Sequence, residues 1–276
     1  MNQKSRFSLG KFLLNAPYVL WSAIFVVVPL LIVVYYAFTD KSGNFSLSNI
    51  GELSQYAGTF ALSIWYSLIA TVITLIIAYP FAYFISRSGV GTEKILIMLV
   101  MLPMWMNLLI RTYSWMNILE NNGIINSVLS SLGLPTLKII GTPGAVIFGM
   151  IYNYFPYMVI PIHSVLSKID PLVLEAAEDL GSNGLSKLFR IVIPLSMPGV
   201  ISGITMVFVP SVSTFYISQK LGGGKILLIG DVIESQMQTS YNYNLGAALS
   251  FVLMLIILLC MTVMRRFASD EPEVLI

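Results

Sequence analysis

Residues 170–181 read Asp-Pro-Leu-Val-Leu-Glu-Ala-Ala-Glu-Asp-Leu-Gly, and they carry both a start signal and a stop signal for one short helix. Asp170 is a good N-cap, and Pro171 suits the first helical position, where a missing N–H costs nothing. Gly181 suits the left-handed backbone that often ends a helix. The sequence therefore predicts a short, self-contained helix over these residues.

The apolar residues of this helix share one face. Leu172, Ala176 and Leu180 recur at four-residue spacing, which places them in one row. A second short helix is predicted from about Gly184 to Val192, stopped by Pro194. Such an amphipathic pair fits two roles equally well, docking into a partner protein or lying on a membrane surface.

On both sides of this segment the chain is dominated by long apolar runs. Of its 276 residues, 57% are hydrophobic and only 10% are charged, whereas a soluble domain carries about 25% charged residues. One core could not bury so much apolar surface, so the excess must face lipid. The net charge of +2 gives no indication of a nucleic-acid partner. A single cysteine and a single histidine exclude an internal disulfide and argue against a zinc site.

Six segments pass the length test for spanning a bilayer, which takes about 20 residues each. The first is too long for the apolar region of a signal peptide, so it is predicted to be a retained transmembrane helix. The fifth is the weakest, because Pro210 interrupts it. The six segments are approximately Pro17–Phe38, Phe60–Ser86, Ile95–Ile118, Ala145–Leu166, Met197–Ile217 and Leu245–Met264.

The distribution of Lys and Arg favours both termini in the cytoplasm. With that orientation, ten basic residues lie inside and five outside. The outer five are Lys41, Arg111, Lys138, Lys220 and Lys225. The predicted organisation is then a cytoplasmic N-terminus at 1–16, a six-helix transmembrane domain at 17–266 with a cytoplasmic loop at 167–196, and a disordered cytoplasmic tail at 267–276.

The cytoplasmic loop carries a pattern that resembles the EAA motif of ABC importer permeases. Glu175-Ala176-Ala177 is followed after three residues by Gly181, after nine more by Ile191, and then by Ile193-Pro194. In that family the motif forms coupling helices that sit in a cleft of the ATPase subunit. The usual leucine before the proline is Ile193 here, a change that conserves volume. The resemblance implies an ATPase-coupling role for Glu175, Ala176, Ala177, Gly181, Ile191 and Pro194.

A wider resemblance, over about residues 17–265, is to the spermidine/putrescine permeases of this family. The stretches that carry it are Ala78–Phe84, Pro103–Tyr113, Glu175–Pro198 and Phe215–Ser218. It implies an all-α membrane protein with the type I (MetI-like) ABC importer permease fold, in the bacterial cytoplasmic membrane. It also implies a second permease of the PotC type, two copies of a PotA-type ATPase and a PotD-type external binding protein. ATP and magnesium would be bound by the ATPase, and this chain would be no enzyme and hold no cofactor or metal.

Polyamines are extended polycations, so their path is expected to offer aromatic faces and polar acceptors. The same residue types anchor helices at membrane interfaces and join helices to one another, so each candidate has a structural alternative. The candidates for the substrate path are Trp105, Asn107, Tyr113, Trp115, Asn153, Phe155, Ser211, Phe215 and Tyr216, with Asp231 as an acid at the outer mouth.

Two ionisable residues in the apolar segments have structural interpretations. Arg111 is predicted to end the third helix at the outer interface, or to pair with an acid such as Glu120. His163 is predicted to be packed and neutral, because no carboxylate lies near it in the sequence.

Other functions remain open at this stage. The coupling motif does not separate a polyamine importer from one for thiamine, an amino acid, sulfate or iron. A channel or secondary transporter predicts intramembrane charge pairs or paired broken helices, and neither is evident. An intramembrane enzyme needs convergent catalytic groups, which the apolar runs almost entirely lack.

Overall fold

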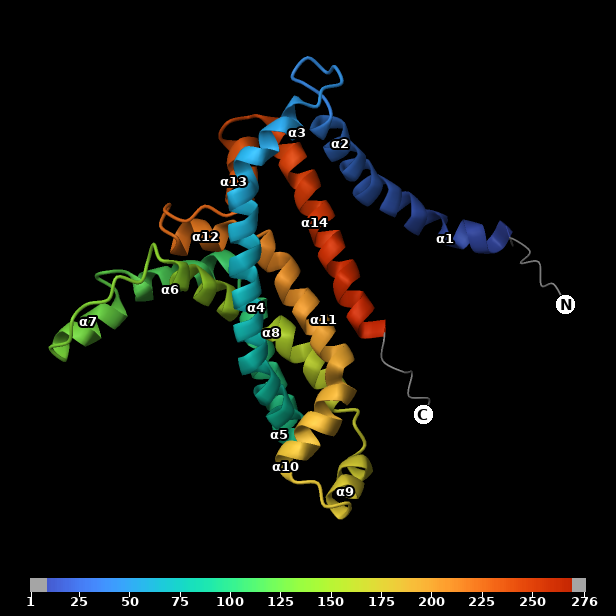
Figure 1. Ribbon diagram of the computed structural model, residues 1–276, viewed down its shortest axis with the longest axis vertical. Coiled ribbons are helices and arrows are strands. Elements are labelled where there is room, and N and C mark those ends of the chain that lie inside the picture. The colour runs from blue at the N-terminus through green and yellow to red at the C-terminus, as the bar shows by residue number, and fades with distance from the viewer. Residues whose placement is uncertain (1–8, 270–276) are drawn as a thin grey trace. The chain divides into compact units, whose positions relative to one another are not determined.

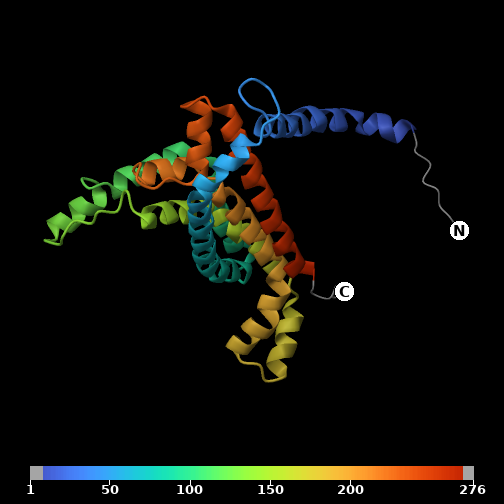
Figure 2. The ribbon, with the colours of Figure 1, turned by 45° about the horizontal axis from the view of Figure 1, so that its top comes forward.

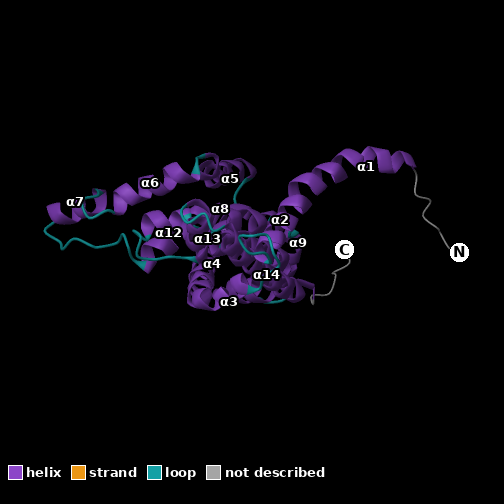
Figure 3. Ribbon diagram, turned by 90° about the horizontal axis from the view of Figure 1, so that it is seen from above, coloured by secondary structure: helices purple, strands orange, loops and turns teal. Residues whose placement is uncertain are grey.

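The computed structural model describes residues 9–269, which are helical apart from short connections (Figure 3). Over this part of the chain, β pairing is limited to an isolated bridge between Thr39 and Phe45. The chain divides into two compact units, which are described separately. They are Met1–Gln55 with Ile233–Met254, and Tyr56–Val232 with Leu255–Ile276.

The first unit begins with one long apolar helix. It consists of α1 (Leu9–Ser22), a π-helical turn η1 (Ala23–Val27) and α2 (Val28–Ala37). The π turn lies directly ahead of Pro29, which has no N–H to donate and whose ring crowds the carbonyl four residues earlier. Within Ala16–Ala37, an 18-residue stretch has no residue buried against the rest of the chain. Such an all-round exposed apolar helix fits contact with lipid.

The other elements of the first unit are joined by polar contacts at one backbone position. The side-chain amides of Asn49 and Asn244 both donate to the carbonyl of Thr39, at 2.9 and 2.7 Å. A small buried cluster of Ala37, Ala247 and Ala248 lies beside them. The elements here are α3 (Ser48–Glu52), η2 (Leu53–Tyr56), α13 (Ile229–Gln238) and α14 (Tyr243–Ser269), of which η2, α13 and α14 extend across the unit boundary.

The second unit is built on three long helices packed together, α4 (Ala57–Ser86), α8 (Pro143–Leu166) and α11 (Ile193–Val212) (Figure 1). Small residues allow α8 and α11 to approach closely. A Cβ at Gly199 would lie 2.8 Å from the carbonyl oxygen of Pro161, and one at Gly203 would lie 2.7 Å from the sulfur of Met158. Spaced as G-x-x-x-G, the two glycines form a small-residue contact typical of membrane helices.

The third predicted helix, Ile95–Ile118, is wrong as a single unbroken helix. The structure has α5 (Val90–Trp105) and α6 (Leu108–Leu119), and the segment Leu108–Ser131 is bent by 92° relative to α5 at the break between them. Met106 is extended there, and Asn107 caps α6 by accepting the N–H of Leu109 at 2.7 Å. The cap stabilises a new helix start inside one apolar run.

The loop after α8 also differs from its prediction in one respect. It holds α9 (Pro171–Asp179) and α10 (Gly184–Lys187), and the latter continues through a π-helical turn η3 (Leu188–Val192) into α11. The prediction that Pro194 stops the second short helix is therefore wrong. As at Pro29, the π turn accommodates the proline, and the helix runs on.

Five of the six predicted spans are confirmed. Over the described residues, five helices are long and apolar enough to cross a membrane, and the bent pair makes a sixth if it crosses as one span. The fifth predicted segment ends early, since α11 stops at Val212 and the short helix α12 (Tyr216–Leu221) lies in the connection that follows. Another short helix, α7 (Ile124–Ser131), lies in the connection between α6 and α8. The predicted tail from 267 is helical up to Ser269, and its remainder lies outside the described residues.

Candidate functional site

The start and stop signals of α9 act as the sequence predicts. Asp170 accepts the N–H of Leu172 at 2.9 Å, directly ahead of Pro171. At the other end Gly181 has a φ of +79°. Its N–H donates to the carbonyl of Glu178, and the next N–H donates to the carbonyl of Ala177, at 2.8 and 3.0 Å. These two bonds are a Schellman motif, which satisfies the last carbonyls of a helix.

The segment between α8 and α11 projects beyond the ends of the long helices of its unit (Figures 1 and 2). Leu174 is buried against the core of that unit. The opposite side is apolar and exposed, with Leu180 at 88% and Leu172 at 67% exposure. The four most exposed large apolar side chains of the segment are called the loop face below, and they are Leu172, Leu180, Leu185 and Phe189. A projecting apolar surface of this kind is typical of a binding site for another protein.

The six motif residues lie on both sides of this segment. Ala177 is buried and Ile191 is half-buried, so both pack inward. The exposed members are Glu175, Ala176, Gly181 and Pro194. An ion pair between Lys187 and Glu178 joins α10 to α9. Since the Glu178 side chain is largely exposed, this pair sets the relative position of the two helices more than it stabilises them.

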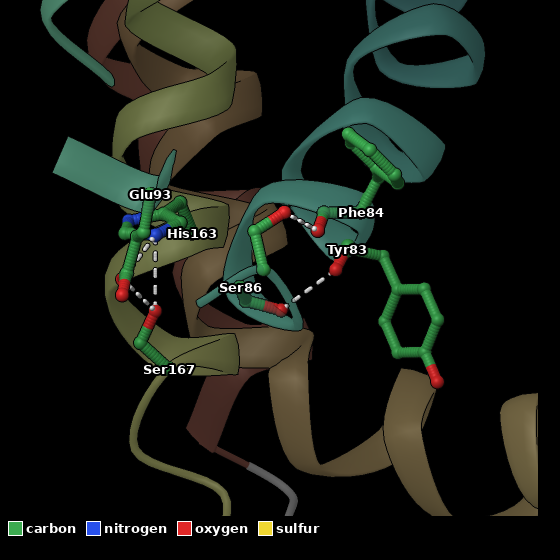
Figure 4. Close-up of polar contacts among 7 residues, drawn as sticks. Tyr83, Phe84, Ser86, Glu93, His163 and Ser167 are labelled. Carbon is green, nitrogen blue, oxygen red and sulfur yellow. Dashed lines mark hydrogen bonds and ion pairs between the residues drawn. The ribbon is translucent and has the colours of Figure 1, made fainter. Parts of the chain in front are cut away.

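A hydrogen-bonded cluster lies where the loop leaves α8 (Figure 4). His163 Nε2 is 2.9 Å from Glu93 Oε1, and Ser167 Oγ lies 3.0 Å from the same nitrogen and donates to Glu93 Oε1 at 3.3 Å. Glu93 comes from the first turn of α5 and His163 from the last turn of α8. His163 was predicted to be packed and neutral because no carboxylate lies near it in the sequence. The structure supplies a carboxylate from a distant position, because the turn at 87–89 brings the start of α5 to the end of α8.

Two of the predicted path residues come together with a third that the sequence did not indicate. The rings of Tyr113 on α6 and Tyr216 on α12 are 6.1 Å apart at 73°. Lys220 Nζ lies over both rings, at 5.0 Å from the first centroid and 5.7 Å from the second. The Tyr113 hydroxyl raises the pKa of Lys220, so the ammonium stays charged at neutral pH. The sequence signal that could have pointed to Lys220 was its four-residue spacing from Tyr216.

Trp115 and Phe155 belong to a different environment. Trp115 packs edge-on against Phe148 at 4.7 Å, and Phe155 packs against Phe81 at 5.8 Å. Both line an apolar pocket of about 470 Å³ between α4, α5, α6 and α8. These contacts fit the helix-packing alternative for the two residues. Trp105, by contrast, is exposed at the end of α5.

The polar candidates are mostly engaged by their own backbone. Asn153 is buried and donates to the carbonyl of Gly149, and Ser211 donates to that of Val207. Asp231 is only 3% exposed and accepts the N–H of Leu228 at 2.7 Å, which caps the start of α13. Asn107 serves as the cap of α6, and Phe215 is exposed beside α12. Their place on a substrate path stays a prediction.

Arg111 does not lie where the sequence placed it. The bend at Met106 and Asn107 puts Arg111 in the first turn of α6, away from the end that Glu120 caps. It is 7% exposed, and its Nε and Nη1 have no hydrogen-bond partner over the part of the chain that the structure describes. The prediction that Arg111 ends the third helix is therefore wrong.

Comparisons with known proteins agree with one another. The family model for the inner membrane component of binding-protein-dependent transport systems matches residues 4–269. The spermidine/putrescine transport system permease protein PotB of Haemophilus influenzae is 37% identical over 256 residues, covering 89% of this chain and 90% of that protein. PotB of Escherichia coli K12 is 36% identical and covers 89% and 93%. The permease YdcU of the latter organism is 27% identical over 286 residues.

Solved structures with the same fold exist. A chain from the crystal structure of a bacterial alginate ABC transporter, in complex with an alginate pentasaccharide-bound periplasmic protein, superposes with a TM-score of 0.72 at 17% identity, covering 94% of this chain and 93% of that one. A second alginate importer structure gives a TM-score of 0.69 at 20% identity. At these identities the likeness concerns the fold alone.

Proposed function

The chain belongs to the family of binding-protein-dependent transport system inner membrane components, and from this premise we propose that it is the permease subunit of an ATP-driven polyamine importer. The observation that carries the proposal is the identity of 36–37% over 89% of the chain to two spermidine/putrescine permeases. In this role the chain forms part of the path through the cytoplasmic membrane and hydrolyses nothing itself.

One proposed partner is suggested by a surface that the chain presents, and the others by the family to which the chain belongs. The loop face, with Leu180 at 88% exposure, is the proposed contact with the ATPase subunit. Because η3 joins α10 to α11 without a break, a displacement of the loop moves a helix of the three-helix core directly. ATP and magnesium are bound by the ATPase in this proposal. A second permease and an external binding protein complete the importer.

An importer for another small solute is the first alternative, because the coupling loop has no part in choosing the substrate. A secondary transporter is less well supported. Transporters of that class often have paired broken helices in two halves of the chain. Over the described residues one helix pair, α5–α6, is bent in this way.

The decisive experiment is reconstitution of the chain with its genomic neighbours in liposomes, followed by measurement of ATP-dependent uptake of labelled spermidine. Leu180→Asp removes an exposed anchor of the loop face without opening a cavity, and Leu132→Asp is the matched control on an exposed leucine outside that face. We expect Leu180→Asp to reduce uptake about tenfold to thirtyfold, as loss of an interface anchor does. Leu132→Asp leaves uptake unchanged.

The outcomes separate the alternatives. Spermidine uptake without ATP or partner subunits contradicts the importer proposal. ATPase activity that responds to another solute and not to spermidine retains the importer and rejects the polyamine. Equal loss in both leucine variants contradicts the assignment of the loop face as the ATPase contact.

A further inference from the structure

The aromatic pair Tyr113–Tyr216 already holds an ammonium group. Lys220 Nζ is within 6 Å of both ring centroids, the range in which a cation is attracted by an aromatic face. The two rings meet edge to face at 73°, so the ammonium contacts two differently oriented rings. The contacts of this ammonium over the described residues include the two rings and the hydroxyl of Tyr113.

The lysine side chain is chemically similar to one end of a polyamine. Both present a primary ammonium on a flexible chain of methylene groups, and spermidine and putrescine contain a four-carbon spacer of the same length as the lysine stem. A pair of rings that holds the Lys220 ammonium therefore has the chemistry to hold a polyamine ammonium in the same place. Tyr113 is 42% exposed, which leaves the site accessible from outside the chain.

We propose that Tyr113 and Tyr216 form a binding site for one terminal ammonium of the substrate, and that Lys220 occupies this site until the substrate displaces it. The inference rests on the proposed polyamine function. It adds that the Lys220 ammonium, which belongs to the same chain, competes with the substrate for the site. Two ammonium groups cannot share one pair of rings, because like charges at that distance repel each other.

The geometry allows the exchange. Lys220 lies one helical turn after Tyr216 on the six-residue helix α12, so its ammonium leaves the rings by side-chain rotation alone. A partly exposed cation–π contact is weak enough for a polycation with additional contacts to displace it. The structural alternative is a clamp in which Lys220 holds α6 to α12. The two interpretations predict opposite effects when Lys220 is removed.

The test measures equilibrium binding of labelled spermidine to the complete ABC complex in nanodiscs, trapped with ATP and vanadate, without the external binding protein. Lys220→Met removes the ammonium and keeps the length of the side chain. Lys225→Met is the matched control, since it removes the same charge from the neighbouring connection, where Lys225 is exposed. Tyr113→Leu removes one ring. The double variant Lys220→Met/Tyr113→Leu completes the cycle.

We expect Lys220→Met to bind spermidine about two- to fivefold more tightly and Tyr113→Leu to bind it more weakly by a similar factor, as the strength of an exposed cation–π contact implies. Lys225→Met leaves the affinity unchanged, and the gain from Lys220→Met disappears in the double variant. Equal gains in both lysine variants overturn the inference in favour of a general charge effect. Unchanged or weaker binding by Lys220→Met overturns it in favour of the clamp.

The failure of the inference differs from the failure of the proposed function. If the wild-type complex takes up spermidine and the Lys220→Met complex has unchanged affinity, only the inference that Lys220 competes with the substrate is overturned. A wild-type complex that neither binds nor takes up spermidine overturns both. Basal ATPase activity of each variant, measured in parallel, shows whether the complex has assembled.

Discussion

Gly181 ends α9 with a φ of +79°, and a Cβ added there would meet no atom within 4 Å. Substitution is therefore limited by backbone strain and not by space. Alanine in this conformation costs about 1–2 kcal/mol, whereas asparagine tolerates it better through local hydrogen bonding. We expect Gly181→Ala to reduce ATP-dependent uptake severalfold, because the Schellman turn that positions the loop is strained. Gly181→Asn should retain most of the uptake, although its side chain is larger.

Uptake and spermidine-stimulated ATPase activity of the reconstituted complex measure this difference. If both variants lose activity in proportion to side-chain size, the glycine leaves room for the ATPase and its backbone conformation is incidental. Thermal unfolding of the two complexes provides the control, since strain confined to one loop leaves the transition of the helical core in place.

At the residue scale, local chemistry was predictable and contacts distant in sequence were not. Asp170 and Gly181 were recognised because a cap and a left-handed glycine act within a few residues. The partner of His163 is Glu93, 70 residues earlier, and no local pattern links them. Lys220 was counted only as a basic residue of an outer loop, although its spacing from Tyr216 was available.

At the scale of elements, the contact between α8 and α11 depends on two glycines. A Cβ at Gly199 would lie 2.8 Å from a backbone oxygen of α8, which no side-chain rotation can move. We expect Gly199→Ala to force the helices apart and to destabilise the complex by about 1–3 kcal/mol, as overpacking does. Gly58→Ala in α4 is the matched control, because a Cβ there meets nothing within 4 Å.

The midpoint of thermal unfolding of the purified complex measures this effect. An unchanged midpoint for Gly199→Ala would show that α11 shifts along α8 at no cost. In that case the close approach of these two helices contributes nothing to stability. A lower midpoint for the Gly58→Ala control would point instead to general damage in membrane insertion.

The existence of the long helices was predictable from the sequence. The positions at which they bend were less predictable. The apolar runs are recognisable in the hydropathy pattern because each run must be long enough to cross the bilayer. The α5–α6 bend depends on Asn107, which was interpreted as a path residue. An asparagine ahead of a second apolar stretch is also an N-cap signal, and this second meaning decides the fold. The π turns ahead of Pro29 and Pro194 show why a proline inside an apolar run is a poor stop signal.

For the whole molecule, the fold does not choose the substrate. The same arrangement of helices, with a TM-score of 0.69, occurs in a transporter that imports the acidic polysaccharide alginate. The proposed substrate here carries the opposite charge. Selectivity is therefore expected to come from side chains on a shared scaffold, for which Tyr113 and Tyr216 are the proposed candidates here.

The distribution of Lys and Arg predicts the orientation of the whole chain, and the proposed coupling role depends on that orientation. With both termini inside, residues 39–59 and 119–144 face outward and 87–94 face the cytoplasm. The chain has a single cysteine, Cys260, so a Cys260→Ser background allows single cysteines to be placed on each side. We expect a membrane-impermeant maleimide to label Ser42→Cys and Thr136→Cys on intact cells. Thr92→Cys, which is also exposed, should react only after permeabilisation.

The reverse pattern would place residues 167–196 outside the cell, where no ATPase has access to Leu180 and Gly181. It would contradict the charge rule for this chain and remove the physical basis of coupling through the loop. Labelling at Ser42→Cys without labelling at Thr136→Cys would show that the bent α5–α6 pair enters and leaves on the cytoplasmic side, and that five helices span the membrane. Because α8 would then run outward, this result would also place residues 167–196 outside and contradict coupling through the loop.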